Sequence, residues 1–210
     1  MVTAAPVTGR GEGTRRCIVD EAALAFARHG YAGTSLNDVI IATGLTKGAF
    51  YFHFPSKEAL ALEVFRSKQQ EWAAKAMDAA ARKERALDQL MEMLRATCAL
   101  HEPDQAARAV ARLCWELGEE PELAPQMTPF LTNWFDLLEG ILRRAQAEGD
   151  VRTDIDARAV AEVCVASFIG ISDVSHLLSG NVDLRRRAEQ LMDLILPTIR
   201  VENPTQRRRA

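Results

Sequence analysis

The sequence lacks a long uninterrupted apolar run. Charged residues break its apolar stretches well short of the ~18 residues that a membrane span needs. Its N-terminus also lacks the basic segment followed by an apolar run that marks a secretory signal. We therefore expect a soluble, cytoplasmic protein, and its 210 residues suffice for one compact domain or for a small domain joined to a larger one.

Cysteine is scarce, and neither cysteine nor histidine is clustered. The four cysteines show neither the CxxC spacing of a metal site nor the density of a disulfide scaffold. The four histidines fall on different predicted helices, without metal-ligand or nucleophile-elbow spacing. This pattern argues against an enzyme and predicts no cofactor and no metal. Only the pair Cys98 and His101, at helical spacing, leaves a metal-sensing regulator open.

A strong positive charge is also missing. The net charge of -3 provides no overall attraction to a polyanion, so any binding of nucleic acid has to come from a local patch. Residues 10–60 are the less acidic part of the chain. A nucleic-acid contact, if present, is therefore expected near the N-terminus.

Sustained alternation of apolar and polar residues, which half-buried strands require, is absent as well. Nearly every segment instead places apolar residues at helical spacing, so we predict an all-α fold of about nine helices. Residues 1–13 are rich in glycine and poor in apolar bulk, which predicts a disordered N-terminal arm. Residues 203–210 are expected to form a flexible tail.

The first helices follow from local signals. The first is predicted from Thr14 to Gly30, and Thr34 or Ser35 can cap a short second helix that ends before Gly44. A third helix follows, capped by Thr46, and it ends before Pro55. Ser56 then opens a long fourth helix. Two short helices joined by residues 43–45 have the spacing of a helix-turn-helix.

The third helix carries donors and small residues suited to a major groove. Lys47 is a candidate base or phosphate donor, while Gly48 and Ala49 let the backbone approach the duplex. The predicted DNA contacts are Arg16, Thr34, Ser35, Thr46, Lys47, Gly48, Ala49, Tyr51, His53 and Lys57.

The aromatic residues of the third helix have a second interpretation as core residues. The pattern favours this interpretation for Phe52 and Phe54. It does not favour it for Tyr51, because a tyrosine hydroxyl needs a polar partner.

These residues resemble the TetR family of transcriptional regulators. The resemblance rests on Gly44 to Lys57, on Phe26 to Tyr31 and on Thr34-Ser35. It implies a DNA-binding domain over 14–60 and a ligand-binding and dimerisation domain over 61–202, with the last two helices forming the homodimer. The implied function is a repressor that binds a palindromic operator as a dimer and is released by a small-molecule effector.

A subgroup is also indicated. Tyr51 to Leu60, and Pro129-Phe130 shortly before Trp134, look like the actinobacterial γ-butyrolactone receptor branch. In that branch a tryptophan stacks over a lactone or furan signal, a role that the resemblance assigns to Trp134.

The apolar stripes of the central helices predict a pocket for a largely apolar effector, although the same stripes can be ordinary core. The predicted effector contacts are Met91, Leu94, Trp115, Phe130, Trp134 and Phe168. A helical protein-interaction module without DNA binding stays open as an alternative. Lys47, Tyr51 and Lys57 favour a DNA reader instead.

Overall fold

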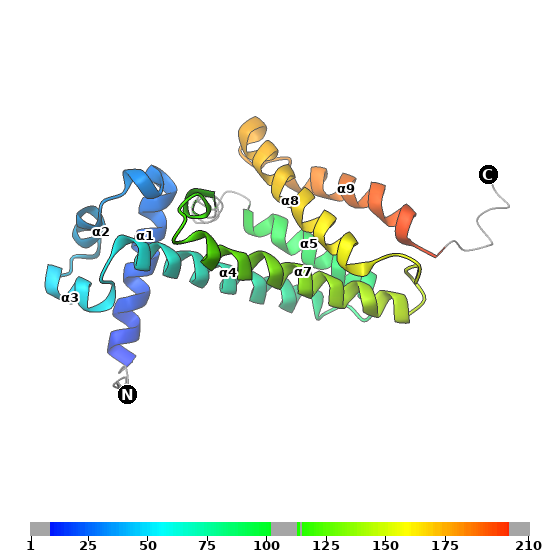
Figure 1. The fold of residues 1–210 in the computed structure, drawn as a ribbon, viewed down its shortest axis with the longest axis horizontal. Helices are drawn as coiled ribbons and strands as arrows, with labels where there is room; N and C mark the ends of the chain where they lie inside the picture. The colour runs from blue at the N-terminus through cyan, green and yellow to red at the C-terminus, as the bar shows by residue number, and fades with distance from the viewer. Residues whose placement is uncertain (1–8, 102–112, 114, 202–210) are drawn as a thin grey trace. The chain divides into compact units, whose positions relative to one another are not determined.

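The computed structural model describes residues 9–101, 113 and 115–201, and their regular structure is helical (Figure 1). The helices are α1 (Gly9–Gly33), α2 (Leu36–Thr43), α3 (Lys47–His53), α4 (Lys57–Ala80), α5 (Ala86–His101), α7 (Ala124–Ala147), α8 (Ala157–Ser179) and α9 (Leu184–Ile199). Residues 113 and 115–118 are helical too. The predicted all-α class is confirmed, and the described residues show these eight helices and part of one more. Residues 1–8, residues 102–112 and the predicted flexible tail 203–210 lie outside the described residues.

The chain divides into two compact units. The N-terminal unit comprises residues 1–71 and 104–127, and the C-terminal unit comprises residues 72–103 and 128–210. Two long helices, α4 and α7, contribute to both units. The N-terminal unit thus extends along α4 to residue 71, and the domain boundary expected at residue 60 stays a prediction.

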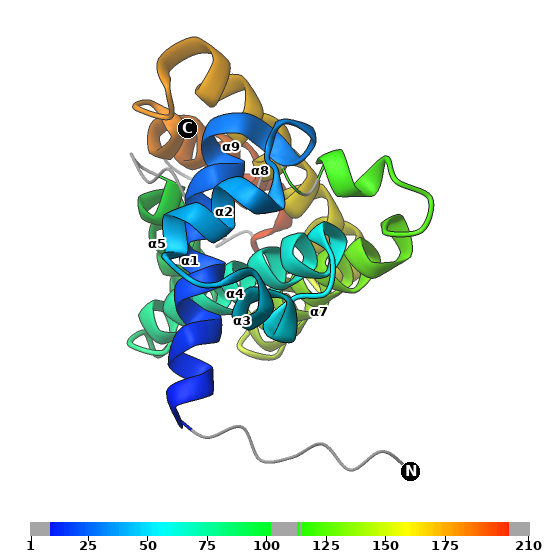
Figure 2. The same ribbon diagram turned by 90° about the vertical axis from the view of Figure 1, so that its left-hand side faces the viewer.

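The N-terminal unit is built on α1, against which α2 packs (Figure 2). Ile18, Ala22 and Phe26 are buried along one face of α1, as their spacing predicts. The helix begins at Gly9, so the start predicted at Thr14 is too late; Glu12 in its first turn suits the positive end of the helix dipole. The stop predicted at Gly30 appears as a kink, with φ 73° and ψ 177° at that glycine.

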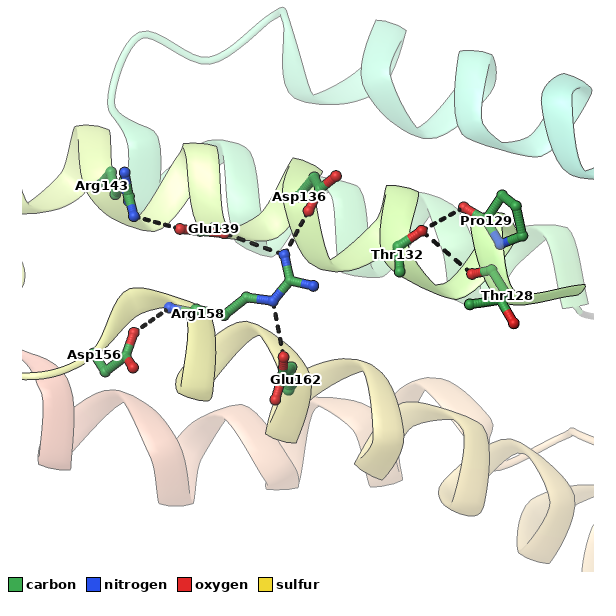
Figure 3. Close-up of polar contacts among 9 residues, drawn as sticks. All are labelled: Thr128, Pro129, Thr132, Asp136, Glu139, Arg143, Asp156, Arg158 and Glu162. Atoms are coloured by element: carbon green, nitrogen blue, oxygen red, sulfur yellow. Dashed lines mark hydrogen bonds and ion pairs between the residues drawn. The ribbon is translucent and has the colours of Figure 1, made fainter. Parts of the chain in front are cut away.

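The helix α7 begins at Ala124 and carries two prolines near its start. Pro125 lies in the first turn, where the missing N–H has no acceptor within the helix. Pro129 lies inside the helix, one turn later. The Thr132 hydroxyl donates hydrogen bonds to the carbonyls of Thr128 (3.3 Å) and Pro129 (3.0 Å) across this turn (Figure 3).

The C-terminal unit buries a large apolar cluster formed by α4, α5, α7, α8 and α9. Within it α9 packs on both α5 and α8. The guanidinium of Arg158 on α8 reaches Asp136 and Glu139 on α7, the latter at 3.3 Å, and Glu162 on its own helix at 2.8 Å (Figure 3). Because the side chains of Asp136 and Glu162 are more than half exposed, we assign the network a role in orienting α7 against α8 more than in stability.

The last two helices expose much apolar surface. Among the described residues, α8 is the one helix long and apolar enough to cross a membrane, and only 22% of the relevant window is buried. Length and composition alone are weak support for a membrane span. Large apolar side chains exposed in this region are Val163, Val174, Leu177, Leu178, Val182 and Leu194.

Candidate nucleic-acid interface

A reciprocal pair of hydrogen bonds begins α2. The Ser35 hydroxyl accepts from the backbone amide of Asp38 (3.2 Å), and the Asp38 carboxylate accepts from the backbone amide of Ser35 (3.3 Å). Hydrogen bonds from Ser35, its hydroxyl first and its backbone amide second, lower the pKa of Asp38. Ser35, and not Thr34, is therefore the capping residue.

Thr34 serves the fold in a different way. Its side chain is buried, and its hydroxyl donates a 2.7 Å hydrogen bond to the carbonyl of Gly30, the residue at which α1 kinks. This position does not suit the DNA contact predicted for Thr34. Ser35 is exposed beside it.

The turn between α2 and α3 is short and depends on one glycine. Gly44 adopts φ 68° and ψ 13°, a left-handed conformation that other residues enter at a cost, and its amide donates to the carbonyl of Ile41. Thr46 then caps α3 by accepting a 3.3 Å hydrogen bond from the amide of Ala49. The two helices and this turn form the predicted helix-turn-helix.

The two faces of α3 differ sharply. Phe50 and Phe54, four residues apart, are fully buried and fasten the helix to the N-terminal unit. The predicted DNA contacts at the start of α3 are all exposed: Thr46, Lys47, Gly48 and Ala49. The buried face thus determines which side chains α3 presents to solvent.

Phe52 departs from the sequence-based interpretation. Its side chain is 85% exposed, so the prediction that it is a core residue is wrong, whereas that for Phe54 is confirmed. Phe52 lies two residues from each buried phenylalanine, about 200° around the helix, which places it on the opposite side. The i, i+4 spacing of the buried pair was the signal that could have identified Phe52 as part of the exposed face. Tyr51 is 47% exposed beside it.

Arg15 braces the end of α3. Its guanidinium carbon lies 4.5 Å from the centroid of the Phe54 ring, and its Nη1 donates to the backbone carbonyl of His53 at 3.5 Å. An ion pair of 3.0 Å also joins it to Glu63 on α4. The neighbouring Arg16, predicted to contact DNA, is exposed, and the side chain of His53 is half-buried.

Tyr31 holds the start of α4. The Lys57 ammonium lies 4.5 Å from the centroid of the Tyr31 ring and donates to the Ala32 carbonyl at 3.4 Å. The Tyr31 hydroxyl donates to Glu58 at 3.1 Å. Burial, followed by the negative charge of Glu58, raises the pKa of Tyr31 to about 12. Lys57, predicted to contact phosphate, is thus positioned by contacts within the N-terminal unit.

Five of the predicted effector contacts lie in the C-terminal unit, and all five are half-buried: Met91, Leu94, Phe130, Trp134 and Phe168. Met91 and Trp134 pack against the large apolar cluster, and Phe168 packs against a smaller one around Cys98. The sixth, Trp115, belongs to the N-terminal unit and is 57% exposed.

The metal-sensing alternative gains no support from the geometry. In the part of the chain that the structure describes, no group of three or more histidine, cysteine or acidic side chains could hold a metal ion. Cys98 is buried, and His101 is engaged with the carbonyl of Thr97 through Nδ1.

The buried anchors, the left-handed turn and the exposed face of α3 define a helix-turn-helix DNA-binding protein. The family model for bacterial regulatory proteins of the tetR family matches residues 18–64, and the tetracyclin repressor-like C-terminal domain matches residues 83–170. TylP, a TetR regulator from Streptomyces fradiae, has a full-length structure that is 33% identical, with a TM-score of 0.75, covering 91% of this chain and 89% of that chain. The chain belongs to the TetR family, whose members are DNA-binding regulators and not enzymes.

Two further relatives carry receptor names. The A-factor receptor protein of Streptomyces griseus is 32% identical over 89% of this chain. The chain spans 63% of the length of that receptor. A solved gamma-butyrolactone receptor, described as an ArpA-like protein, is 29% identical with a TM-score of 0.71 and covers 95% of this chain and 93% of that chain.

Proposed function

We propose that this chain is a cytoplasmic, homodimeric transcriptional repressor that binds a palindromic DNA operator and leaves it when a small, largely apolar effector binds. The observation that carries the proposal is the exposed face of α3, with Lys47 and Gly48 in its first turn. Membership of the TetR family supports the same function.

Gly48 supports a close approach of α3 to DNA. A Cβ atom added at Gly48 would meet no other atom within 4 Å, so the fold itself leaves room for a side chain. Glycine inside a helix costs about 1 kcal/mol relative to alanine. The fold does not require this loss of helix stability at Gly48. A close approach of the α3 backbone to the duplex would explain why glycine is there. Lys47 beside it then supplies the positive charge.

The exposed apolar residues of the last helices support the dimer. Leu177 and Leu178 near the end of α8 are 82% and 69% exposed, and Leu194 on α9 is 74% exposed. Large apolar side chains exposed on two helices that pack together favour a contact with another protein surface. A symmetric pair of chains presents two copies of α3, and recognition helices about 34 Å apart meet successive major grooves of a palindrome.

The effector is proposed to be a butyrolactone or furan-type signal. The names of the A-factor receptor and of the gamma-butyrolactone receptor support this class. Trp134, half-buried on α7 against the apolar cluster, is the residue proposed to stack on the effector ring. An effector that fits the non-binding arrangement of the dimer better shifts the population away from the operator.

The test is a gel-shift titration of the purified protein against DNA flanking its own gene, with and without a synthetic alkyl γ-butyrolactone. We expect one DNA fragment with a palindromic site to be shifted, and we expect the lactone to release the protein from it. We expect Lys47→Ala to weaken operator binding about tenfold or more, because it removes one positive contact from each half-site.

The matched control is Lys83→Ala, which removes the same charge from an exposed position outside the helix-turn-helix. Equal operator affinity of Lys47→Ala and the unchanged protein would refute α3 as the reading helix. A shift that no lactone or furan releases would reject the proposed effector class and leave DNA binding intact.

A further inference from the structure

Three aromatic rings from different helices meet inside the C-terminal unit. The imidazole centroid of His101, at the end of α5, lies 5.1 Å from that of Trp72 on α4. It also lies 5.6 Å from the ring of Phe168 on α8, in an edge-to-face arrangement. Trp72 is buried, and Phe168 is one of the predicted effector contacts. The group combines apolar faces with one polar ring.

The tautomer of His101 follows from its hydrogen bond. Its Nδ1 lies 2.8 Å from the carbonyl oxygen of Thr97, one helical turn earlier. Because a carbonyl oxygen can only accept, Nδ1 carries the proton in this bond. Burial lowers the pKa of His101, which keeps the ring neutral at pH 7. The second ring nitrogen, Nε2, is therefore a hydrogen-bond acceptor.

A second acceptor approaches the same residue from the turn between α8 and α9. Asn181 is 5% exposed, and its Nδ2 donates to the backbone carbonyl of His101 at 3.3 Å. This bond orients the amide. Its Oδ1 is buried and has no hydrogen-bond partner in the described part of the chain. A buried polar atom without a partner costs about 1–3 kcal/mol, so it calls for a ligand or a water molecule.

We propose that His101 Nε2 and Asn181 Oδ1 form the polar end of the effector site, where they share the single proton of a hydroxyl group of an uncharged effector in a three-centre hydrogen bond. Trp72 and Phe168 contact the apolar part of that effector. The inference rests on the proposed function, because it assumes an effector site in the C-terminal unit. Both groups are uncharged and present a lone pair to the ligand. They therefore favour an alcohol, which brings a proton, over a carboxylate, whose negative charge would face the two lone pairs.

The probes are octanol, its methyl ether and octanoate, which share a chain and differ in the polar group. We expect octanol to bind about five- to tenfold more tightly than the ether, the value of one neutral hydrogen bond, and octanoate to bind most weakly. Calorimetry measures the affinities. Nitrogen NMR of the histidine rings should show the Nε2 signal of His101 moving with octanol but not with the ether.

His101→Phe keeps an aromatic ring between Trp72 and Phe168 and removes the acceptor. We expect this variant to bind octanol with a smaller preference over the ether, because Asn181 Oδ1 is left as the one acceptor of the pair, and the exposed His176→Phe to keep the full preference. Asn181→Gly is a second variant, because glycine tolerates the φ of 74° found there; we expect it to reduce the preference.

An unchanged preference in both the His101 and Asn181 variants would overturn the proposal, as would an unmoved Nε2 signal or octanoate as the best ligand. Failure to bind any probe would also count against it. Operator release by lactones is measured separately. Failure of that release with the octanol preference intact would therefore reject the lactone-controlled repressor and not this polar site.

Discussion

Glycine at position 48 has opposite effects on the stability of the fold and on the proposed DNA binding. Its neighbourhood leaves space for a methyl group, and its backbone is helical. Gly48→Ala should therefore raise the free energy of unfolding by about 0.5–1 kcal/mol and weaken operator binding about tenfold. Urea denaturation and fluorescence anisotropy with operator DNA measure the two effects. A variant that is more stable and binds equally well would remove the argument for close backbone approach.

The raised pKa of Tyr31 should make the stability of the protein depend on pH in alkaline solution. Its folded pKa of about 12 lies above the ordinary value near 10, so the folded state holds the proton more tightly. Stability from this group is complete below pH 10 and is lost as the pH rises from about 10 to 12. We expect about 1 kcal/mol, after a discount for the exposed part of the side chain.

The measurement is an absorbance titration, since the chain has only two tyrosines. Tyr31→Phe should lose the phase near pH 12, and its unfolding free energy should depend less on pH above pH 10. The control, Tyr51→Phe, should keep that phase. If the phase persists in Tyr31→Phe, it belongs to another group, and burial and Glu58 do not raise the pKa of Tyr31 to that value.

The geometry of the helix-turn-helix element depends on the turn at Gly44. A Cβ atom there would meet no neighbour, so only its left-handed φ of 68° opposes a side chain. Gly44→Ala should lower the free energy of unfolding by about 1 kcal/mol and weaken operator binding. Gly140→Ala, in the middle of α7 with equal space, should stabilise the protein by about 0.5–1 kcal/mol. Thermal melts of the pair check the sign, and equal shifts would contradict the argument.

At the scale of the whole molecule, the exposed apolar surface of α8 and α9 bears on assembly. Leu194→Glu would place a carboxylate in the proposed dimer contact, where burial of an unpaired charge is unfavourable. We expect the dimer dissociation constant to rise at least about tenfold and operator binding to weaken in parallel. Sedimentation velocity over a concentration series measures the first.

Met77→Glu is the control for this dimer prediction, because Met77 is a 50% exposed apolar residue on α4. This variant should remain dimeric. Equal dimer stability of the two variants would show that α9 lies outside the contact.

Local signals of the sequence alone determined the all-α class and the caps and turns that separate the first helices. Ser35, Gly44, Thr46 and Ser56 act on backbone groups within four residues, so their roles can be deduced from spacing. The same locality explains why the start of α1 was misplaced. A proline or a glycine-rich segment weakens a helix locally, but packing of the rest of the helix can outweigh that cost.

Only the tertiary structure decided which side chains are available. The burial of Thr34, the exposure of Phe52 and the site of Trp115 depend on which faces of their helices are covered. The placement of Lys57 over Tyr31, and of Asn181 against His101, joins residues 26 and 80 positions apart in the chain. Hydrogen bonds and ring contacts act over a few ångströms in space, and spacing along a sequence does not encode which distant segments come within that range.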